Sequence, residues 1–474
     1  MAADPIPGQI AAACADVRPA TTADMVAGVQ PALVASPEST PECASLLRAA
    51  TELGLAVIPR GTGSRLGWGY PPERADLVID TGRLDHVVEH AAGDLVATVQ
   101  AGLRLDVLAG VLGAAGQRLA LDPPPLGTPG TVGGVLATGA AGPLRLRYGT
   151  ARDLLIGITV VRADGTVAKS GGKVVKNVAG YDIGKLFAGS RGTLGLITQA
   201  TFRLHPRPAE VAYVSATCPA AVAACQVVAA ALESPTAPSA AEIDWPAAGD
   251  QVRVCIALEG EAAGVADRAM ALAGLVSGLG GQARPSVSPQ PPPWWGRGPA
   301  AQQDGTVLQI GFWPGDLGVV LAEIRAAAAA AGVDPAVAGS AGAGVLQVGL
   351  TDDGDPGAIA AYVAVLRTAL GHALPADSGH RLADIPRPLA HSRAGGGRSW
   401  PAAGHGTSPA GPGQPRSGEG PPARANVTVL HAPPAVGTLV DLFGPIPSLP
   451  LMRAVKHQFD PGRVMSPGRF AGRI

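Results

Sequence analysis

The chain has 474 residues, more than a single domain of about 250–300 residues holds, so two or three domains are expected. It contains 65 glycines and 45 prolines, yet 47% of its residues are hydrophobic, 15% are charged and the net charge is −1. This composition excludes collagen and a wholly disordered chain, and the balanced charge gives no sign of nucleic-acid binding. The five cysteines lack Cys-x-x-Cys spacing, and no signal peptide or transmembrane segment is predicted, so we expect a cytoplasmic protein.

The first two hundred residues alternate between helix and strand patterns. Ser39, Thr40 and Pro41 are typical of a helix start, and Gly54 is expected to end that helix. A second helix is predicted over residues 106–115, before Gly116. Short apolar runs predict strands at 55–58, 76–80, 86–90, 95–100 and 155–162.

From about residue 205 the pattern predicts a second α+β domain built from two similar halves. The first half has strands at 211–217 and 252–258 and helices at 220–232 and 265–279; the second has strands at 307–312 and 345–350 and helices at 317–331 and 359–370. A stretch rich in proline, ending in Trp294 and Trp295, separates the halves. Residues 394–424 are rich in glycine and proline without a periodic apolar face, which predicts a disordered loop.

Several familiar sequence motifs have neighbouring residues that do not suit the structure each motif requires. His86, Glu89 and His90 match a zinc-peptidase pattern that requires a helix, but the paired valines between them favour a β-hairpin. The glycines from Gly61 to Gly67 have the wrong spacing for a dinucleotide fingerprint, and prolines follow where a helix should begin. No Walker-type phosphate loop is present. We therefore predict no metal site and neither a simple Rossmann nor a phosphate-transfer fold.

Three glycine-dense segments remain, at residues 59–69, 127–139 and 189–198. Glycine allows backbone N–H groups to turn toward an anion without obstruction by a Cβ atom, and serine and threonine hydroxyls add donors. Arg60 and Arg147 could add positive charge. Together the segments suggest a long, phosphate-bearing ligand. Tight turns in a protein rich in small residues are the alternative interpretation.

These segments resemble the FAD-binding domain of the vanillyl-alcohol oxidase and p-cresol methylhydroxylase (PCMH-type) superfamily. The resemblance rests on the runs Pro59–Ser64, Thr131–Gly139, Gly142–Gly149 and Gly192–Thr198. A lysine-to-phenylalanine stretch at 176–187 and the tail at 456–470 narrow it to the FAD-binding subunits E of bacterial glycolate oxidases. The fold implied is α+β: a PCMH-type FAD-binding domain of two subdomains and a cap with a ferredoxin-like repeat. We expect domains at 1–204 and 205–392, a loop at 393–425 and a segment at 426–474 that returns to the FAD domain.

The resemblance also implies which residues hold the cofactor. The first two segments would hold the FAD pyrophosphate, residues near 138–142 the flavin side, and residues near 195–197 the ribityl or adenine part. Because Thr62 and Ser64 flank Gly63 where covalent relatives often carry a histidine, we expect non-covalent FAD. The complete set of expected cofactor residues is Arg60, Gly61, Thr62, Gly63, Ser64, Thr131, Gly133, Gly134, Thr138, Gly139, Gly142, Gly195 and Ile197.

The function implied is that of an FAD-dependent subunit in a glycolate oxidase-type complex that oxidises a short 2-hydroxy acid to the 2-oxo acid. A sister flavin subunit and an iron–sulfur subunit are the expected partners, with the complex in the cytoplasm or peripheral at the inner membrane. The His-x-Gly-Asp-Gly-Asn stretch of catalytic relatives is absent, and Ser466 replaces a usual asparagine. A non-catalytic assembly or electron-relay subunit is therefore the alternative. Lys176, Tyr181 and Arg147 could face the flavin, but we assign no catalytic residue.

Overall fold

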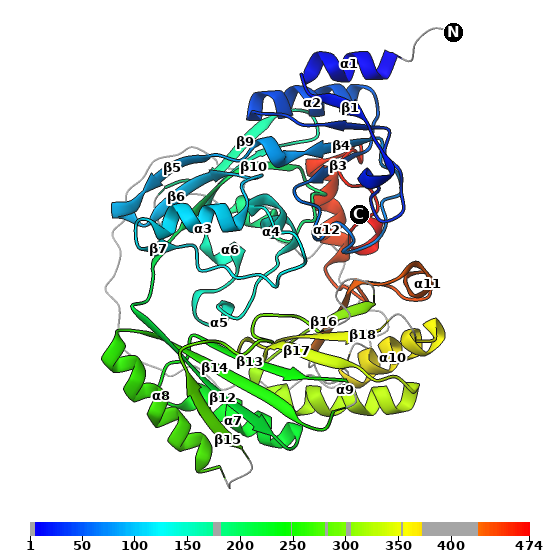
Figure 1. Cartoon of the computed structure of the whole chain (residues 1–474). Helices are drawn as coiled ribbons and strands as arrows, with labels where there is room; N and C mark the ends of the chain where they lie inside the picture. The colour runs from blue at the N-terminus through cyan, green and yellow to red at the C-terminus, as the bar shows by residue number, and fades with distance from the viewer. Residues whose placement is uncertain are drawn as a thin grey trace, which may run out of the picture.

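The computed structural model describes residues 5–173, 182–247, 249–279, 283–299, 305–351, 354–371 and 425–474. Lys176, Tyr181 and all of the predicted disordered stretch at 394–424 lie outside these residues. In Figure 1 two smaller sheets form the upper part of the molecule, and one large sheet forms the lower part. The boundaries between domains remain the prediction made from the sequence.

The upper part holds both N-terminal sheets. The first has the order β1 (Val17–Pro19), β2 (Leu33–Ala35), β4 (Leu77–Asp80), β3 (Val57–Arg60). The second has the order β5 (Val87–Ala91), β6 (Val96–Gln100), β10 (Leu196–Arg203), β8 (Leu155–Val161), β9 (Val167–Gly171). Strands β7 (Gln117–Arg118) and β11 (His205–Pro206) form a short pair. The helices here are α1 (Pro5–Ala13), α2 (Thr40–Glu52), α3 (Leu105–Gly113), α4 (Val132–Thr138), α5 (Arg145–Tyr148) and α6 (Ala151–Leu154).

The lower part is a single eight-stranded sheet with helices on one face (Figure 1). Its order is β15 (Arg284–Ser288), β12 (Glu210–Cys218), β14 (Val252–Gly260), β13 (Ala240–Trp245), β17 (Ala336–Ser340), β18 (Val345–Leu350), β16 (Thr306–Phe312), β19 (Ala425–His431). The covering helices are α7 (Ala221–Glu233), α8 (Ala262–Ser277), α9 (Leu317–Ala331) and α10 (Pro356–Ala369). Each half therefore runs β-α-β-β-α-β, the ferredoxin-like unit, and the halves join where β13 pairs with β17.

The expected fold class is confirmed, and the hairpin of β5 and β6 excludes the helix that the zinc-peptidase motif would need. Helix α2 begins as predicted: the Ser39 hydroxyl accepts a hydrogen bond from the Glu42 amide at 3.3 Å, and Gly54 follows the helix with φ +65°. The start of the C-terminal segment differs from expectation. Residue 425, predicted in the loop, begins β19, which adds to the lower sheet beside β16. The rest of the segment returns to the upper part, where Met465 forms a bridge with Val57 and the Val57 amide donates to the Val464 carbonyl at 2.8 Å.

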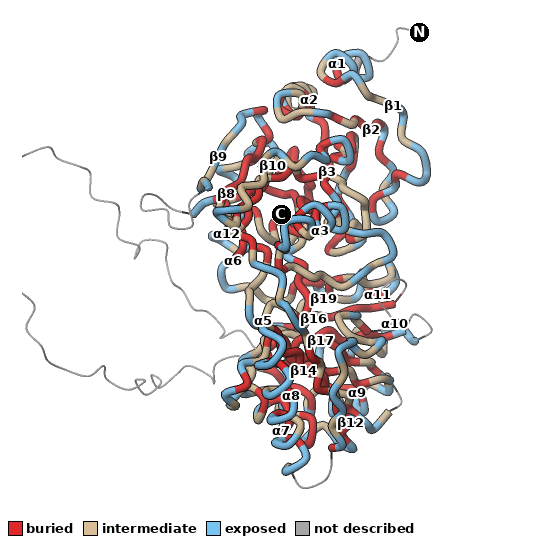
Figure 2. Tube along the Cα trace, turned by 60° about the vertical axis from the view of Figure 1, so that its left-hand side comes forward, coloured by how far each residue is buried: buried red, intermediate tan, exposed pale blue. Residues whose placement is uncertain are grey.

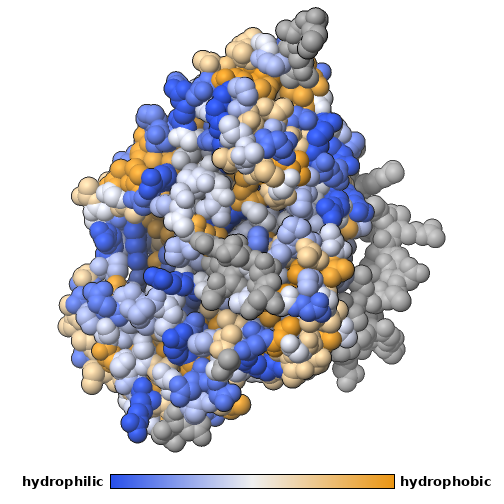
Figure 3. Space-filling view, turned by 45° about the vertical axis from the view of Figure 1, so that its right-hand side comes forward, coloured by the Kyte–Doolittle hydropathy of each residue, from blue (hydrophilic) through white to orange (hydrophobic). Residues whose placement is uncertain are grey.

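Buried residues follow the strands of both parts, and the helices turn exposed residues outward (Figure 2). The surface in Figure 3 mixes hydrophilic and hydrophobic residues without separating them into two regions. Among the described residues, no helix is long and apolar enough to cross a membrane.

A buried ion pair ties the lower sheet to the upper part. Arg118 of β7 donates two hydrogen bonds of 2.8 Å to the Glu259 carboxylate of β14, whose side chain is only 5% exposed. The Tyr148 hydroxyl of α5 donates to the same carboxylate at 2.8 Å. Because these groups come from three elements on both sides of the interface, the pair sets how the lower sheet faces the upper part.

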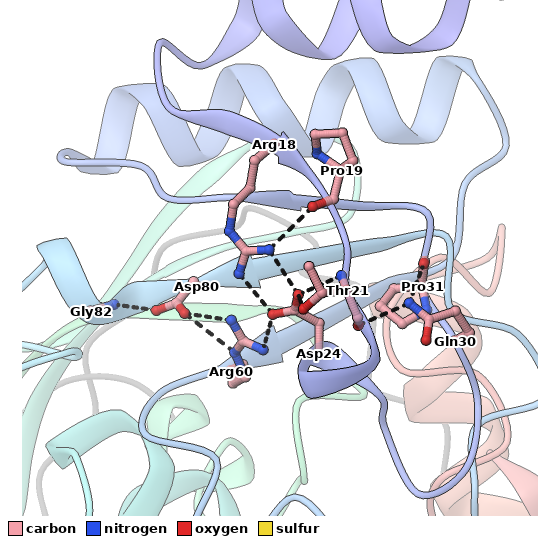
Figure 4. Close-up of polar contacts among 9 residues, drawn as sticks. All are labelled: Arg18, Pro19, Thr21, Asp24, Gln30, Pro31, Arg60, Asp80 and Gly82. Atoms are coloured by element: carbon pink, nitrogen blue, oxygen red, sulfur yellow. Dashed lines mark hydrogen bonds and ion pairs between the residues drawn. The ribbon is translucent and has the colours of Figure 1, made fainter.

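A second network fixes the end of β3 (Figure 4). Arg60 donates to Asp24 at 2.9 Å and to Asp80 at 2.7 Å, and Arg18 donates to Asp24 at 2.7 Å. The hydrogen bond from Arg18, with others from Thr21 and Arg60, holds the pKa of the buried Asp24 carboxyl well below its usual range. The network thus anchors the strand that leads into the first glycine-dense segment.

Replacing Asp24 by asparagine removes the carboxylate that two arginines share. We expect Asp24→Asn to lower the free energy of unfolding by about 3 kcal/mol at neutral pH. A carboxyl whose pKa is depressed by folding stabilises the protein above its ordinary pKa, so the difference between wild type and variant should shrink as pH falls below about 4. Urea unfolding at several pH values measures this. Asp16→Asn, at an exposed ion pair with Arg83, is the matched control, and equal losses for both variants would contradict the assignment.

Candidate cofactor-binding site

One large cavity lies in the upper part, with about 860 Å³ of empty space that includes some open solvent. Segments far apart in the sequence meet around it: the end of β3 with the loop after it, helix α4, the segment before β10, and the C-terminal tail. Its lining includes residues from 58 to 68, from 130 to 138, from 191 to 197, and at 466 and 469.

All but two of the cofactor residues expected from the sequence line this one cavity. Gly139 instead ends helix α4 with φ +67°, and Gly142 lines a second, smaller cavity. The structure thus brings the three glycine-dense segments together. The contact of each residue with FAD stays a prediction.

The first segment offers backbone donors. The amides of Thr62, Gly63 and Ser64 donate to no group in the described part of the chain. Gly63 has φ +77°, a conformation that favours glycine and lets successive N–H groups converge. The Thr131 side chain fills the space that a Cβ atom at Gly61 would need, so the loop passes directly over helix α4. This arrangement suits a phosphate group.

The second segment is partly a helix rather than the expected loop, because the Thr131 hydroxyl caps α4 by accepting from the Gly134 amide at 3.1 Å. The Gly133 amide donates to the Ala101 carbonyl at 2.7 Å. Both glycine amides are therefore engaged within the protein. A Cβ atom at Gly133 would lie 2.8 Å from the Ala101 Cβ, so close packing requires glycine here.

Three arginines give the cavity its charge. Arg65, Arg191 and Arg469 line it, and each has a buried guanidinium nitrogen without a hydrogen-bond partner in the described part of the chain. Burial lowers the pKa of each to about 10, and for Arg191 the neighbouring charge of Arg469 adds to the effect. No carboxylate is among the described residues that line the cavity. Buried cations without counter-charges favour an anionic ligand.

The two arginines noted in the sequence have other partners. Arg60 lines the cavity, but its charge is paired with Asp24 and Asp80, so it shapes the loop. Arg147 is directed to the lower sheet, where it donates to the Ser239 hydroxyl at 3.4 Å, and it does not line the cavity. Sequence reasoning missed the roles of Arg191 and Arg469, although both lie in motifs it singled out.

A buried lysine joins the third segment to the tail. Lys456 lies in α12 (Leu449–Phe459), after the short helix α11 (Pro434–Gly437). Its ammonium group donates to the Thr193 carbonyl at 2.7 Å, to the Met465 carbonyl at 2.8 Å and to Asp460 at 2.6 Å. Burial lowers the pKa of Lys456, and the contact with Asp460 opposes that effect. These bonds hold Ser466 and Arg469 at the cavity wall.

Comparison with known proteins agrees with this geometry. Residues 31–171 match the family model described as "FAD binding domain". Glycolate oxidase subunit GlcD of Bacillus subtilis is 37% identical over 180 residues, 38% of each chain. D-lactate dehydrogenase of Archaeoglobus fulgidus is 37% identical over 37% of this chain and 39% of that protein. Glycolate oxidase subunit GlcE of Escherichia coli is 36% identical over 32% of this chain and 43% of that protein. The matched segment thus spans less than half the length of these relatives.

The fold as a whole has a close solved counterpart. The structure of p-cresol methylhydroxylase with substrate bound superposes with a TM-score of 0.68 at 14% identity, covering 98% of this chain and 96% of that one. At this identity the likeness concerns the fold alone. Residues 31–171 are therefore an FAD-binding domain, FAD is the cofactor of this chain, and the chain has the fold of p-cresol methylhydroxylase.

Proposed function

We propose that this chain is an FAD-dependent oxidoreductase, a subunit of a glycolate oxidase-type complex that oxidises a short 2-hydroxy acid to the 2-oxo acid. The observation that carries the proposal is the cavity of the FAD-binding domain, which is lined by backbone amides and three arginines that have no hydrogen-bond partner or counter-charge, respectively, among the described residues. Relatives named as glycolate oxidase subunits and a D-lactate dehydrogenase support the substrate class.

The protein's part in this reaction is binding and orientation. FAD, when bound, accepts two electrons as the hydroxyl-bearing carbon of the acid loses a hydride and the hydroxyl loses a proton. The amides of residues 62–64 and the arginines at the cavity wall would hold its diphosphate. The lower sheet, tied down by Arg118 and Glu259, acts as a cap.

A second candidate is a non-catalytic FAD-binding assembly or electron-relay subunit. It is favoured by the absence of the His-x-Gly-Asp-Gly-Asn stretch and by Trp313, whose side chain is 78% exposed and suits contact with a partner. Trp295, in contrast, packs against Tyr213 with ring centres 5.2 Å apart, and Trp400 lies outside the described residues.

We also propose a sister flavin subunit and an iron–sulfur subunit as partners, in a complex that lies in the cytoplasm or is peripheral at the inner membrane. The relatives named as glycolate oxidase subunits D and E support an assembly of several chains. The five cysteines are all free, which suits a reducing compartment.

Arg469 offers a direct test of the cofactor site. We expect Arg469→Met to weaken FAD binding about tenfold or more, because a charge-assisted hydrogen bond to the cofactor is lost. Fluorescence titration of FAD into the flavin-free protein measures the dissociation constant. Arg463→Met is the control, since Arg463 lies in the same tail but is exposed and pairs with Glu73. Equal dissociation constants for both variants would place the cofactor elsewhere.

Whether FAD is covalently attached to the protein is tested in a separate experiment. The described residues around the cavity include no histidine or cysteine, the usual points of attachment for flavin, so we expect dissociable FAD. After denaturation and filtration the yellow colour should pass into the filtrate. Colour retained on the protein would show a covalent bond.

Stopped-flow mixing of the purified, flavin-loaded chain with glycolate or D-lactate tests the activity. Loss of the visible flavin absorbance in the isolated chain is the expected result for direct oxidation. Bleaching that occurs only after the other subunits are added would instead support the relay role. A protein that purifies colourless and is not stabilised by FAD would contradict both candidates.

A further inference from the structure

The second cavity lies at the interface between the upper part and the lower sheet. It has about 330 Å³ of empty space, part of it open solvent. The upper part contributes residues 141–143, Arg145 and Pro124; the lower sheet contributes Glu242 of β13, Ser340 of β17 and Gln347 of β18. It therefore lies at the seam where the two halves of the cap meet.

Glu242 presents an unusual group to this cavity. The residue is 4% exposed, and its Oε1 atom has no hydrogen-bond partner in the described part of the chain. Burial raises the pKa of Glu242 to about 8, while the nearby Ser340 hydroxyl and the charge of Arg145 oppose the shift. Burial therefore favours the neutral form of this carboxyl, and the oxygen without a partner among the described residues can hydrogen-bond a ligand.

Arg145 supplies positive charge to the same cavity. Its guanidinium donates to the Gly142 carbonyl at 3.1 Å and to the Ala141 carbonyl, but among the described residues it has no carboxylate within ion-pair distance. Burial raises the pKa of the neighbouring Asp122 to about 7, so that carboxyl only partly balances the arginine. Arg297 is exposed and adds a second cation to the lining. The cavity thus combines a partly buried cation with a buried carboxyl.

We propose that this seam cavity is the binding site for the 2-hydroxy acid, with Arg145 pairing with the substrate carboxylate and Glu242 hydrogen-bonding the substrate hydroxyl. A 2-hydroxy acid carries both groups on adjacent carbons and so satisfies both side chains at once. Simple carboxylic acids satisfy only Arg145. Both residues act as binding and specificity residues.

The position of the seam cavity beside the FAD cavity agrees with a substrate-binding role. This inference rests on the proposed function. Thr138 lines the FAD cavity, and Ala141, three residues later, lines the seam cavity. Arg65 of the FAD cavity donates to the carbonyl of Pro124, a lining residue of the seam cavity, at 2.6 Å. The two cavities are therefore neighbours.

Isothermal titration of the full, FAD-loaded chain tests the inference. Glycolate and D-lactate are compared with acetate and propionate, which lack the hydroxyl. We expect the wild-type protein to bind each hydroxy acid about tenfold more tightly than its partner without the hydroxyl. Arg145→Met should weaken binding of all four acids about tenfold or more. Glu242→Leu should abolish the preference for hydroxy acids without changing the binding of acetate and propionate.

The controls separate recognition from folding. Glu242→Gln retains a hydrogen-bonding group and should restore the preference for hydroxy acids. Asp244→Asn changes a carboxyl on the same strand that pairs with Arg253 outside the cavity, and it should leave all four affinities unchanged. The flavin spectrum of each variant reports whether the fold is intact. The preference of the wild-type protein for hydroxy acids over acetate and propionate is measured without any variant, so it does not depend on whether the variants fold.

Two results would overturn the inference: wild-type protein that binds glycolate and D-lactate no better than acetate and propionate, or affinities unaffected by Arg145→Met. Flavin bleaching distinguishes these results from failure of the proposed function. If the residues control binding but the complete complex never bleaches, the site stands and the oxidation is wrong. If bleaching occurs without residue dependence, the oxidation stands and this site is wrong.

Discussion

In the part of the chain that the structure describes, buried positive charge without a counter-charge is the constraint around which the FAD-binding domain is arranged. Arg65, Arg191 and Arg469 are brought together although burial disfavours their charged forms. Burying unpaired arginines raises the free energy of the folded protein without its ligand, and binding of an anion offsets this penalty. The diphosphate of FAD is such an anion, so binding free energy of the cofactor adds directly to the stability of the folded chain.

The same constraint explains why the C-terminal tail must return to the upper part. Arg469 donates to the carbonyls of Leu66 and Trp68, which closes the first glycine loop from the opposite side. Arg191 lies over the rings of Phe443 and Phe470, at 4.9 and 5.9 Å from their centres. Lys456 then joins the tail to the third segment. The cavity exists only when these parts of the chain have folded together.

The sequence predicted the regular elements well where the pattern was strong. Leucine and valine periodicity identified α2, α9 and the strands β16 and β18. It missed β13, β17 and β15. Small residues in β13 and β17, and alternating polar residues in β15, give little apolar signal. It also missed α4, whose glycines suggest a loop but whose small residues permit contact with Ala101.

The site was predicted in part for a similar reason. Local motifs identify residues whose neighbours in space are also neighbours in sequence, such as Thr62, Gly63 and Ser64. They do not show burial or pairing, which depend on distant segments. Arg60 and Arg469 are both arginines beside glycine or proline, yet one is neutralised by Asp24 and Asp80, and the other is not. Only the folded arrangement distinguishes them.

The cap illustrates how a repeated unit can create a site that neither half contains. Each ferredoxin-like half ends at a strand that would be an open edge, and the pairing of β13 with β17 removes both edges. In β17, Gly339 has φ +141°, and a Cβ atom there would lie 2.7 Å from the Val345 carbonyl, so β17 and β18 approach closely beside the seam. The seam faces helix α5, which carries Arg145, while Arg118 and Glu259 fix that orientation. A polar cavity therefore forms where two repeats and a second domain meet, and its residues could not have been identified from either repeat alone.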